Sequence, residues 1–164
     1  MVLCSSCKMD SSQAEIERID DNLICHSCLF QGNRPYGIYP IGFIENNLSL
    51  SENLHMEGDR EQISKVVLLQ SQKPFLYKLE EESHIVVVFY FHIQRPIRSK
   101  FNRSLDQKEV GVFASRTPDR LSRIGITEVE LIKIDGTTLY VKGLYAVNES
   151  PVLDIKLGGL SLKN

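Results

Sequence analysis

Short apolar stretches, each bounded by polar residues, recur along the chain after residue 38. The segment 84–93 is apolar or aromatic at every position between its two histidines, which is typical of a strand buried on both faces. The segments 126–134 and 138–147 alternate apolar and polar residues on either side of Asp135-Gly136. That dipeptide favours a tight turn because it tolerates positive φ angles, so the pattern predicts an antiparallel hairpin.

Four further strands are predicted, at 39–44, 63–69, 110–115 and 152–157. Pro40 restricts the first of them to a strand start or edge. The polar stretch 46–60 predicts a long loop, and Phe75–Leu79, which follows Pro74, predicts a single helical turn. Six or seven strands with little helix predict a mainly β fold, a closed or nearly closed β-barrel over residues 38–160.

The composition is that of a globular protein. The 164 residues are 42% hydrophobic and 24% charged, which fits one domain with a small appendage. No apolar run reaches the roughly 18–20 residues that a membrane helix needs. The N-terminus lacks the basic and apolar segments of a secretory signal. We therefore predict a cytoplasmic protein without a membrane partner.

Charge is distributed unevenly. Between residues 95 and 123 there are eight basic and three acidic residues, whereas the whole chain has a net charge of −2. A basic loop on an acidic protein can position phosphate groups, so this segment is a candidate for binding RNA. A solvated surface loop is the alternative. The residues proposed for the RNA contact are Arg95, Arg98, Lys100 and Arg103.

All four cysteines lie in the first 28 residues, as Cys4-Ser-Ser-Cys7 and Cys25-His-Ser-Cys28, with seventeen residues between the pairs. This is the spacing of a zinc site with two Cys-x2-Cys knuckles. Four thiolates complete the tetrahedron that structural Zn²⁺ requires. We predict a zinc ribbon over residues 1–32 with a hairpin turn at Asp20-Asp21-Asn22, followed by a linker at 33–37.

Two other uses of the cysteines are a redox Cys-x-x-Cys motif and a pair of disulfides. A cytoplasmic setting and the paired spacing weigh against both. His26 lies inside the second knuckle and is interpreted as a neighbour of the metal, because four thiolates already fill the coordination shell. A filled shell indicates a structural rather than a catalytic metal.

The most specific motifs are Gly111-Val-Phe-Ala-Ser-Arg116-Thr-Pro-Asp-Arg120, Ile124-Gly125 and Pro151-Val-Leu-Asp154-Ile-Lys156. In these residues the chain resembles the TsaA/YaeB-like family, whose best-known members are TrmO-type tRNA methyltransferases. The resemblance covers residues 39–157 and leaves the ribbon outside. It implies a β-barrel that binds S-adenosylmethionine and methylates N6 of a modified adenosine beside the tRNA anticodon. Because the family's barrels are commonly dimeric, it also implies a homodimer.

The resemblance implies a set of site residues. Arg116 would contact the cofactor or its carboxylate, and Ile126 would lie beneath the cofactor. The loop 145–150 would close over it. The cofactor-binding candidates are His92, Ile93, Arg116, Arg120, Ile126, Tyr145, Asn148, Glu149 and Ser150. Asp154 and Lys156 are the candidates for catalysis, and the resemblance does not separate support from catalytic roles.

Each of these residues also has a plain structural interpretation. Arg116 would pair with Asp154, His92 would be a hydrogen-bonded barrel residue, and Lys156 would lie on the surface of a strand. The family pattern has prolines at Leu121 and Arg123 and a glycine at Glu149. We therefore expect Glu149 to adopt the backbone angles of a glycine.

Three functions follow from the sequence. The first is an S-adenosylmethionine-dependent methyltransferase that acts on RNA, most plausibly tRNA. The second is a catalytically degenerate barrel that, with the zinc ribbon, binds RNA or protein. The altered loops at 121–123 and 145–150 support this alternative. The third is a methyltransferase for a small molecule.

Overall fold

The computed structural model describes residues 2–51, 56–59, 61–103 and 106–159 of the chain. Two compact units are present. The barrel unit comprises residues 38–93 and 123–164, and the ribbon unit comprises residues 1–37 and 94–122. The segment 94–122, which the sequence assigns to the barrel domain, therefore groups with the N-terminal ribbon. We call this segment the insert.

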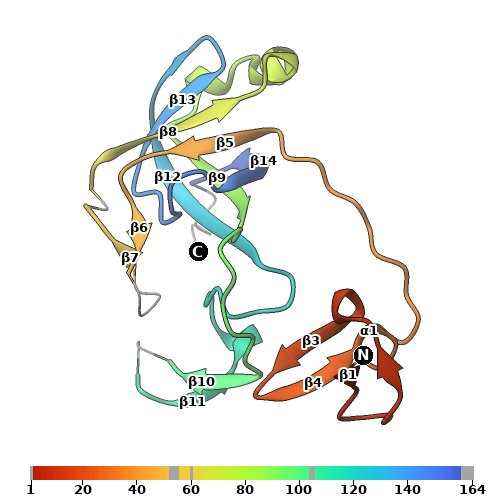
Figure 1. Ribbon diagram of the computed structural model, residues 1–164. Coiled ribbons are helices and arrows are strands. Elements are labelled where there is room, and N and C mark those ends of the chain that lie inside the picture. The colour runs from red at the N-terminus through yellow and green to blue at the C-terminus, as the bar shows by residue number, and fades with distance from the viewer. Residues whose placement is uncertain (1, 52–55, 60, 104–105, 160–164) are drawn as a thin grey trace. The chain divides into compact units, whose positions relative to one another are not determined.

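The barrel unit is a closed sheet of six antiparallel strands (Figure 1). Their order around the barrel is β12-β13-β8-β5-β14-β9, and β9 pairs with β12 to close it. This confirms the prediction of a mainly β fold with a closed barrel. The strands are β5 (Gly42–Glu45), β8 (Ile63–Leu68), β9 (His84–Tyr90), β12 (Ile124–Asp135), β13 (Thr138–Lys142) and β14 (Pro151–Leu157).

The barrel core follows from the alternation of side chains along each strand. In β9, Ile85, Val87 and Phe89 are buried, and the residues between them are half-buried on the outer face. Each buried aliphatic or aromatic side chain of this size contributes about 1.5–3 kcal/mol. Gly125 of β12 leaves room for this core, because a Cβ at that position would lie 2.5 Å from Cζ of Phe89.

Several elements differ from the sequence prediction. Residues 110–115 were expected as one strand, but β11 (Glu109–Gly111) is followed by a 3₁₀ turn, η4 (Val112–Ala114). The predicted strand 138–147 ends at Lys142. The single helical turn predicted at Phe75–Leu79 is wrong in its bounds: η2 (Gln70–Leu76) includes Pro74, Tyr77 and Lys78 are not helical, and η3 (Leu79–Glu81) follows them. The long loop 46–60 carries two short strands, β6 (Ser49–Leu50) and β7 (Met56–Glu57).

The ribbon unit is built from short elements around the cysteines. They are β1 (Val2–Leu3), β2 (Asp10–Ser11), η1 (Gln13–Glu15), β3 (Ile16–Ile19), β4 (Asn22–Cys25) and α1 (His26–Phe30). The β3–β4 hairpin turns at Asp20-Asp21, as predicted, with φ angles of 45° and 68°. Positive φ at both central residues is the mark of a type I′ turn, which matches the twist of paired strands.

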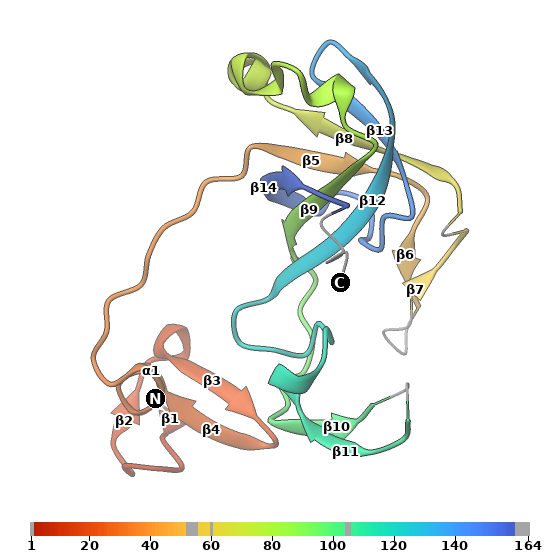
Figure 2. The same cartoon turned by 180° about the vertical axis from the view of Figure 1, so that it is seen from behind.

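The insert contributes a third two-stranded sheet to the ribbon unit, beside β1–β2 and β3–β4. β10 (Lys100–Asn102) pairs with β11, and this pair lies next to the β3–β4 hairpin in both views (Figure 2). Ile19 of the hairpin forms a parallel β-bridge with Ile97 of the insert. The ribbon and the insert are thus joined by main-chain contacts. Among the helices of the described residues, none is long and apolar enough to cross a membrane.

Candidate functional site

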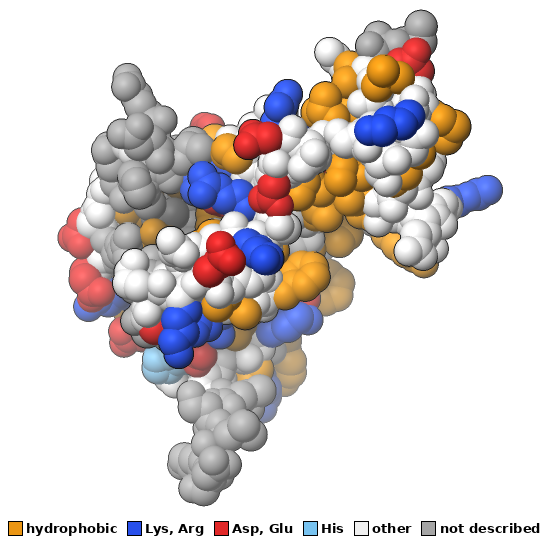
Figure 3. All heavy atoms as spheres, turned by 90° about the horizontal axis from the view of Figure 1, so that it is seen from below, with side chains coloured by type: hydrophobic (Ala, Val, Ile, Leu, Met, Phe, Trp, Pro, Cys, Tyr) orange, Lys and Arg blue, Asp and Glu red, His pale blue; other side chains and the backbone are white. Residues whose placement is uncertain are grey.

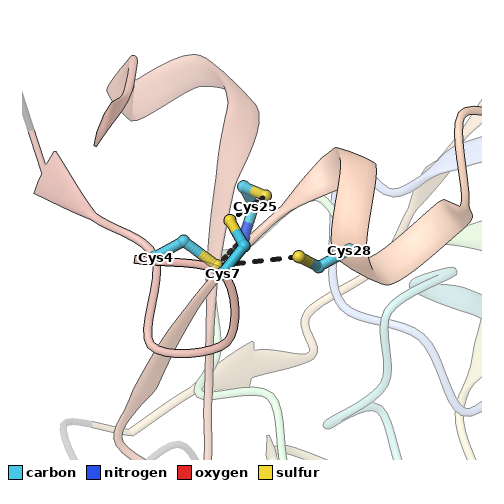
Figure 4. Close-up of side chains that lie close together, drawn as sticks. All are labelled: Cys4, Cys7, Cys25 and Cys28. Carbon is cyan, nitrogen blue, oxygen red and sulfur yellow. Dashed lines mark hydrogen bonds between the residues drawn. The ribbon is translucent and has the colours of Figure 1, made fainter. Parts of the chain in front are cut away.

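The four cysteine sulfurs point toward one another (Figure 4). They all lie within 4.8 Å of one another, with 4.0 Å between Cys4 and Cys28 and 3.9 Å between Cys7 and Cys25. Four sulfurs bound to one Zn²⁺ at about 2.3 Å in a tetrahedron are about 3.8 Å apart. The cluster therefore has the dimensions of a tetrahedral zinc site.

The local electrostatics favour a thiolate at Cys4. The amide of Cys25 donates to Cys4 Sγ at 3.4 Å. The backbone N–H groups of Cys25 and Cys7 lower the pKa of Cys4 to about 6. The neighbouring sulfurs of Cys25 and Cys7 raise the pKa of Cys28 to about 12. A cation at the centre would offset the repulsion of four thiolates at this separation, so the donor set fits zinc.

His26 takes part in a different group of contacts. Its Nε2 lies 3.5 Å from Oε1 of Glu17, and its ring packs edge-on against Phe30 at 5.4 Å between centroids. In the part of the chain that is described, the metal-sized cluster comprises the four cysteines alone. The interpretation of His26 as a neighbour agrees with these contacts.

One end of the barrel gathers several of the predicted cofactor-binding residues. His92 and Ile93 follow β9, separated from its last residue, Tyr90, by Phe91; His92 is exposed and Ile93 is half-buried. Ile126 of the adjacent strand β12 lies opposite Val88 of β9 and is 48% exposed. Since directly opposed residues of antiparallel strands share a face, Ile126 and Val88 form an apolar strip on the outside of the barrel.

The loop 145–150 lies at the same end, because Val152, just after it, pairs with Phe89 near the end of β9. Asn46, which follows β5, fastens this loop. Its side-chain amide donates to the Ala146 carbonyl at 2.9 Å, and its backbone amide donates to Oδ1 of Asn148 at 3.0 Å. Asn148 is therefore already engaged in holding the loop closed.

Two residues of this loop have unusual environments. Glu149 has a φ of 65°, so the expectation that it adopts glycine-like angles agrees with the structure. Its amide donates to the Ile44 carbonyl at 2.8 Å. Ser150 is fully buried, yet its Oγ has no hydrogen-bond partner among the residues that are described. Tyr145, the first residue of the loop, is 40% exposed.

Arg116 and Arg120 lie in the insert and have opposite environments. The Arg116 side chain is exposed, and no described residue lies within hydrogen-bonding or ion-pairing reach of it. Arg120 is half-buried and donates to three carbonyls: Nε to Thr117 at 2.8 Å, and Nη2 to Ser115 at 2.6 Å and Val112 at 3.1 Å. Arg120 therefore holds together the loop from which Arg116 projects.

The catalytic candidates lie along β14. Asp154 is opposite Val88, and Lys156 is opposite Val86. The two side chains form an ion pair of 2.6 Å and are half or more exposed. Both also line a hollow of about 630 Å³ together with Tyr77 and other residues of 72–82. Among the described residues that line this hollow, none belongs to the predicted cofactor-binding set.

The basic segment is less free than its composition indicates. Arg95 is largely buried and binds Asp119 at 2.7 Å, and Arg103 binds Asp106 at 2.7 Å. The Asp106 carboxylate beside Arg103 has its pKa lowered by that contact. Arg98 and Lys100 remain exposed, with acidic partners at 4.0 Å and 3.9 Å. Blue and red side chains lie interspersed on the face shown in Figure 3.

Sequence reasoning missed two residues that organise these loops. Asn46 was taken as the start of a featureless loop, although a polar pair directly after an apolar strand is a signal for capping contacts. Asp119 was counted only as a negative charge, although it neutralises Arg95 and its carbonyl accepts from the amide of Arg98 at 3.2 Å. Whether the predicted cofactor residues act together stays a prediction.

The sequence profile of the tRNA-methyltransferase O N-terminal domain family matches residues 55–157. A "probable S-adenosyl-L-methionine-binding protein" of Methanothermobacter thermautotrophicus is 31% identical over 121 residues, which are 73% of this chain and 87% of that protein. The human tRNA (adenine(37)-N6)-methyltransferase is 29% identical over 126 residues, which are 71% of this chain.

A crystal structure of TrmO from Pseudomonas aeruginosa superposes with a TM-score of 0.56 at 24% identity, over 76% of this chain. At this identity the likeness shows a common fold. The chain spans only part of these longer relatives, 29% of the human protein and 56% of the crystallised one.

Proposed function

Because the chain belongs to the tRNA-methyltransferase O N-terminal domain family, we propose that it is an S-adenosylmethionine-dependent methyltransferase that acts on an adenine of tRNA. The position proposed is N6 of a modified adenosine next to the anticodon, and a cytoplasmic location is part of the same proposal. The observation that carries the assignment is the match of residues 55–157 to that family. Within these residues, the guanidinium of Arg116 is exposed, lacks a partner among the described residues and sits on a loop held by hydrogen bonds.

S-adenosylmethionine supplies, when bound, an electrophilic methyl group on a sulfonium. Each unit, taken by itself, contains side chains of a kind that such a ligand binds. Arg116 offers two parallel N–H groups to a carboxylate, the pairing that best fixes the orientation of a guanidinium. The strip formed by Ile126 and Val88 offers an apolar surface.

The loop 145–150 would exclude water from the reacting groups. Its fastening by Asn46 and the left-handed Glu149 limit its freedom. A loop that is ordered before binding loses less conformational entropy when a ligand arrives. Asp154 and Lys156 keep their role as candidates for support or catalysis.

For tRNA we propose a contact through the ribbon unit. Of the predicted basic loop, Arg98 and Lys100 are exposed enough to meet phosphate, whereas Arg95 and Arg103 hold the insert together. Phe113 is 90% exposed in the turn that precedes Arg116. An exposed aromatic ring close to a free guanidinium suits stacking on an unpaired base.

We also propose that the four cysteines hold a structural Zn²⁺. Among the residues of 2–37 whose burial is described (all but Ala14), Cys4 and Cys25 are the only buried ones, so these residues form almost no apolar core. Zinc-binding free energies of about 10–16 kcal/mol replace such a core in small ribbons. The homodimer implied by the family resemblance stays a prediction.

Calorimetry with S-adenosylmethionine on the zinc-loaded chain tests the central assignment. We expect binding in the native protein, a marked loss in Arg116→Ala and no change in Arg18→Ala. Arg18 is an exposed arginine of the same unit without a partner among the described residues. Absence of heat at millimolar cofactor would overturn the proposal, and equal affinity in the two variants would remove Arg116 from the site.

Transfer of a labelled methyl group to tRNA separates the enzyme from the degenerate alternative. We expect label in tRNA, in a nuclease fragment that contains the anticodon loop. Retention of tRNA without transfer of label would indicate a binding module instead.

A further inference from the structure

The ribbon meets the insert through the turn of its own hairpin. The carboxylate of Asp20 accepts hydrogen bonds from the amide of Ser99, at 3.0 Å to Oδ1 and 3.2 Å to Oδ2, and from the Ser99 hydroxyl. The amide of Asp20 donates to the Ile97 carbonyl at 3.2 Å. These donors from Ser99 hold the pKa of Asp20 below its ordinary value. The residues joined are 79 positions apart in the sequence.

The position of Asp20 depends on the cysteine cluster. Asp20 and Asp21 occupy the type I′ turn between β3 and β4, and β4 ends at Cys25. With hardly any apolar core in the described ribbon residues, the β3–β4 pairing relies on the metal for stability. When the metal leaves, the turn that presents Asp20 is expected to lose its fixed geometry.

The contact continues from Ser99 to the loop of Arg116. The Ser99 carbonyl accepts from the amide of Val112 at 3.0 Å. The Val112 carbonyl in turn accepts from Nη2 of Arg120 at 3.1 Å and from the Ser115 hydroxyl at 2.8 Å. A continuous series of hydrogen bonds thus leads from the ribbon turn to the residues that flank Arg116.

We propose that Asp20 is a positioning residue through which zinc loading of the ribbon sets the order of the loop 111–120. The consequence for ligands, that cofactor or tRNA affinity depends on zinc, rests on the proposed function. The coupling between the metal and the loop does not, because it is a property of the ribbon unit alone.

Amide hydrogen exchange of the full chain, zinc-loaded and after chelation, tests the coupling directly. Loss of metal should speed exchange about tenfold at the amides of Ser99 and Val112, because their acceptors lose order. Exchange in β9 of the barrel should stay unchanged, which serves as the internal reference. Unchanged protection of Ser99 and Val112 in metal-free protein would overturn the proposal.

Substitutions distinguish a role of the Asp20 side chain from a role in the turn. Asp20→Ala should speed exchange at Val112 while the zinc site stays intact; the d–d absorption of a Co²⁺-substituted sample of the variant checks that the four-cysteine site still forms. Asp20→Asn should restore protection, because its side-chain oxygen accepts hydrogen bonds and asparagine tolerates positive φ. Asp21→Ala changes the same turn without touching Ser99 and should have no effect at Val112. Equal effects of Asp20→Ala and Asp21→Ala would show a role in the turn alone.

Cofactor calorimetry on the same variants extends the test to function. We expect Asp20→Ala to weaken S-adenosylmethionine binding several-fold and Asp20→Asn to restore it. If native protein binds no cofactor while exchange still responds to zinc, the proposed function fails and the coupling stands. If native protein binds equally well with and without zinc, the dependence of the ligand on zinc is refuted.

Discussion

Substitutions of Arg120 can distinguish between two roles of this residue, stabilising its own loop and binding a ligand. The family resemblance places it with the cofactor-binding residues, whereas in the structure three of its N–H bonds are directed at carbonyls of its own loop. If the structural role dominates, Arg120→Ala releases the loop whether or not a ligand is present. Arg116→Ala should leave the loop intact and remove only ligand binding.

The size of the effect follows from these three contacts. A hydrogen bond that involves a charged group contributes about 1.5–3 kcal/mol when both partners are removed from water. Arg120 is only half-buried, and the carbonyls of Val112, Ser115 and Thr117 can turn toward solvent once it is gone. We therefore expect a net loss near the lower end, about 2 kcal/mol in the free energy of local opening.

Hydrogen exchange of the loop without ligand provides the assay. A loss of about 2 kcal/mol corresponds to roughly thirtyfold faster exchange at the amides of Val112 and Ser115. Arg120→Lys keeps the charge but brings a single ammonium group, which cannot satisfy three diverging carbonyls, so it should recover little of the protection. If Arg120→Ala exchanges these amides at the same rate as the native protein but no longer binds the cofactor, the structural role is refuted and Arg120 contacts the ligand directly.

Three further predictions concern the barrel, the RNA contact and the loop over the site. Gly125→Ala should lower the free energy of unfolding in urea by about 1–3 kcal/mol, because the new methyl group collides with the barrel core. Gly37→Ala should leave the free energy of unfolding unchanged, because its methyl group would have no atom within 4 Å. Phe113→Ala should weaken tRNA binding about 5- to 150-fold if its ring stacks on a base, whereas Tyr36→Ala, equally exposed at 96%, should not change it. Asn46→Ala should release the loop 145–150 and raise the KM for S-adenosylmethionine more than it lowers kcat; an unchanged KM would argue against a role of that loop at the cofactor.

The features that the sequence predicts well are those decided over short distances. The Cys-x2-Cys knuckles need only a few residues each to bring their sulfurs together, and the cysteine cluster formed as the spacing indicated. The apolar run of β9 and the alternation around the β12–β13 turn are local signals that predict these strands. The expectation that β9 is buried on both faces was wrong, because its outer-face residues are half-buried or exposed. The turn lies one residue later than expected, at Gly136-Thr137, where Gly136 takes the first central position with a φ of 61°; a glycine at that position also makes a tight hairpin turn.

The features that the sequence does not predict are set by distant partners. The excess of basic residues in the sequence predicted that the insert is a basic loop. The structure shows that the charge of Arg95 is neutralised by Asp119, which lies 24 residues later in the sequence. Val112, Phe113 and Ala114 are consecutive apolar residues, as in a strand, yet they form a 3₁₀ turn. Hydrogen bonds of Val112 with Arg120 and with Ser99 hold the backbone in this compact loop. The packing of residues 94–122 with the N-terminal ribbon likewise depends on contacts between residues far apart in the sequence, such as Ile19 with Ile97, which the local sequence pattern does not predict.

The place where the insert interrupts the barrel affects both the cost of folding the barrel and the freedom of the insert to vary in sequence and length. Tyr90 and Ile124 are direct partners in neighbouring strands, so closing the barrel requires residues 91–123 to be gathered into one loop. The entropic cost of closing a loop falls by about 0.6 kcal/mol each time the number of residues in the loop is halved. Replacing residues 91–123 by a four-residue turn would therefore lower the free-energy cost of bringing the two strands together by about 2 kcal/mol. The length of the insert therefore adds to the entropic cost of closing the barrel. A segment attached in this way can be exchanged, lengthened or redesigned while the strand pair that frames it stays the same.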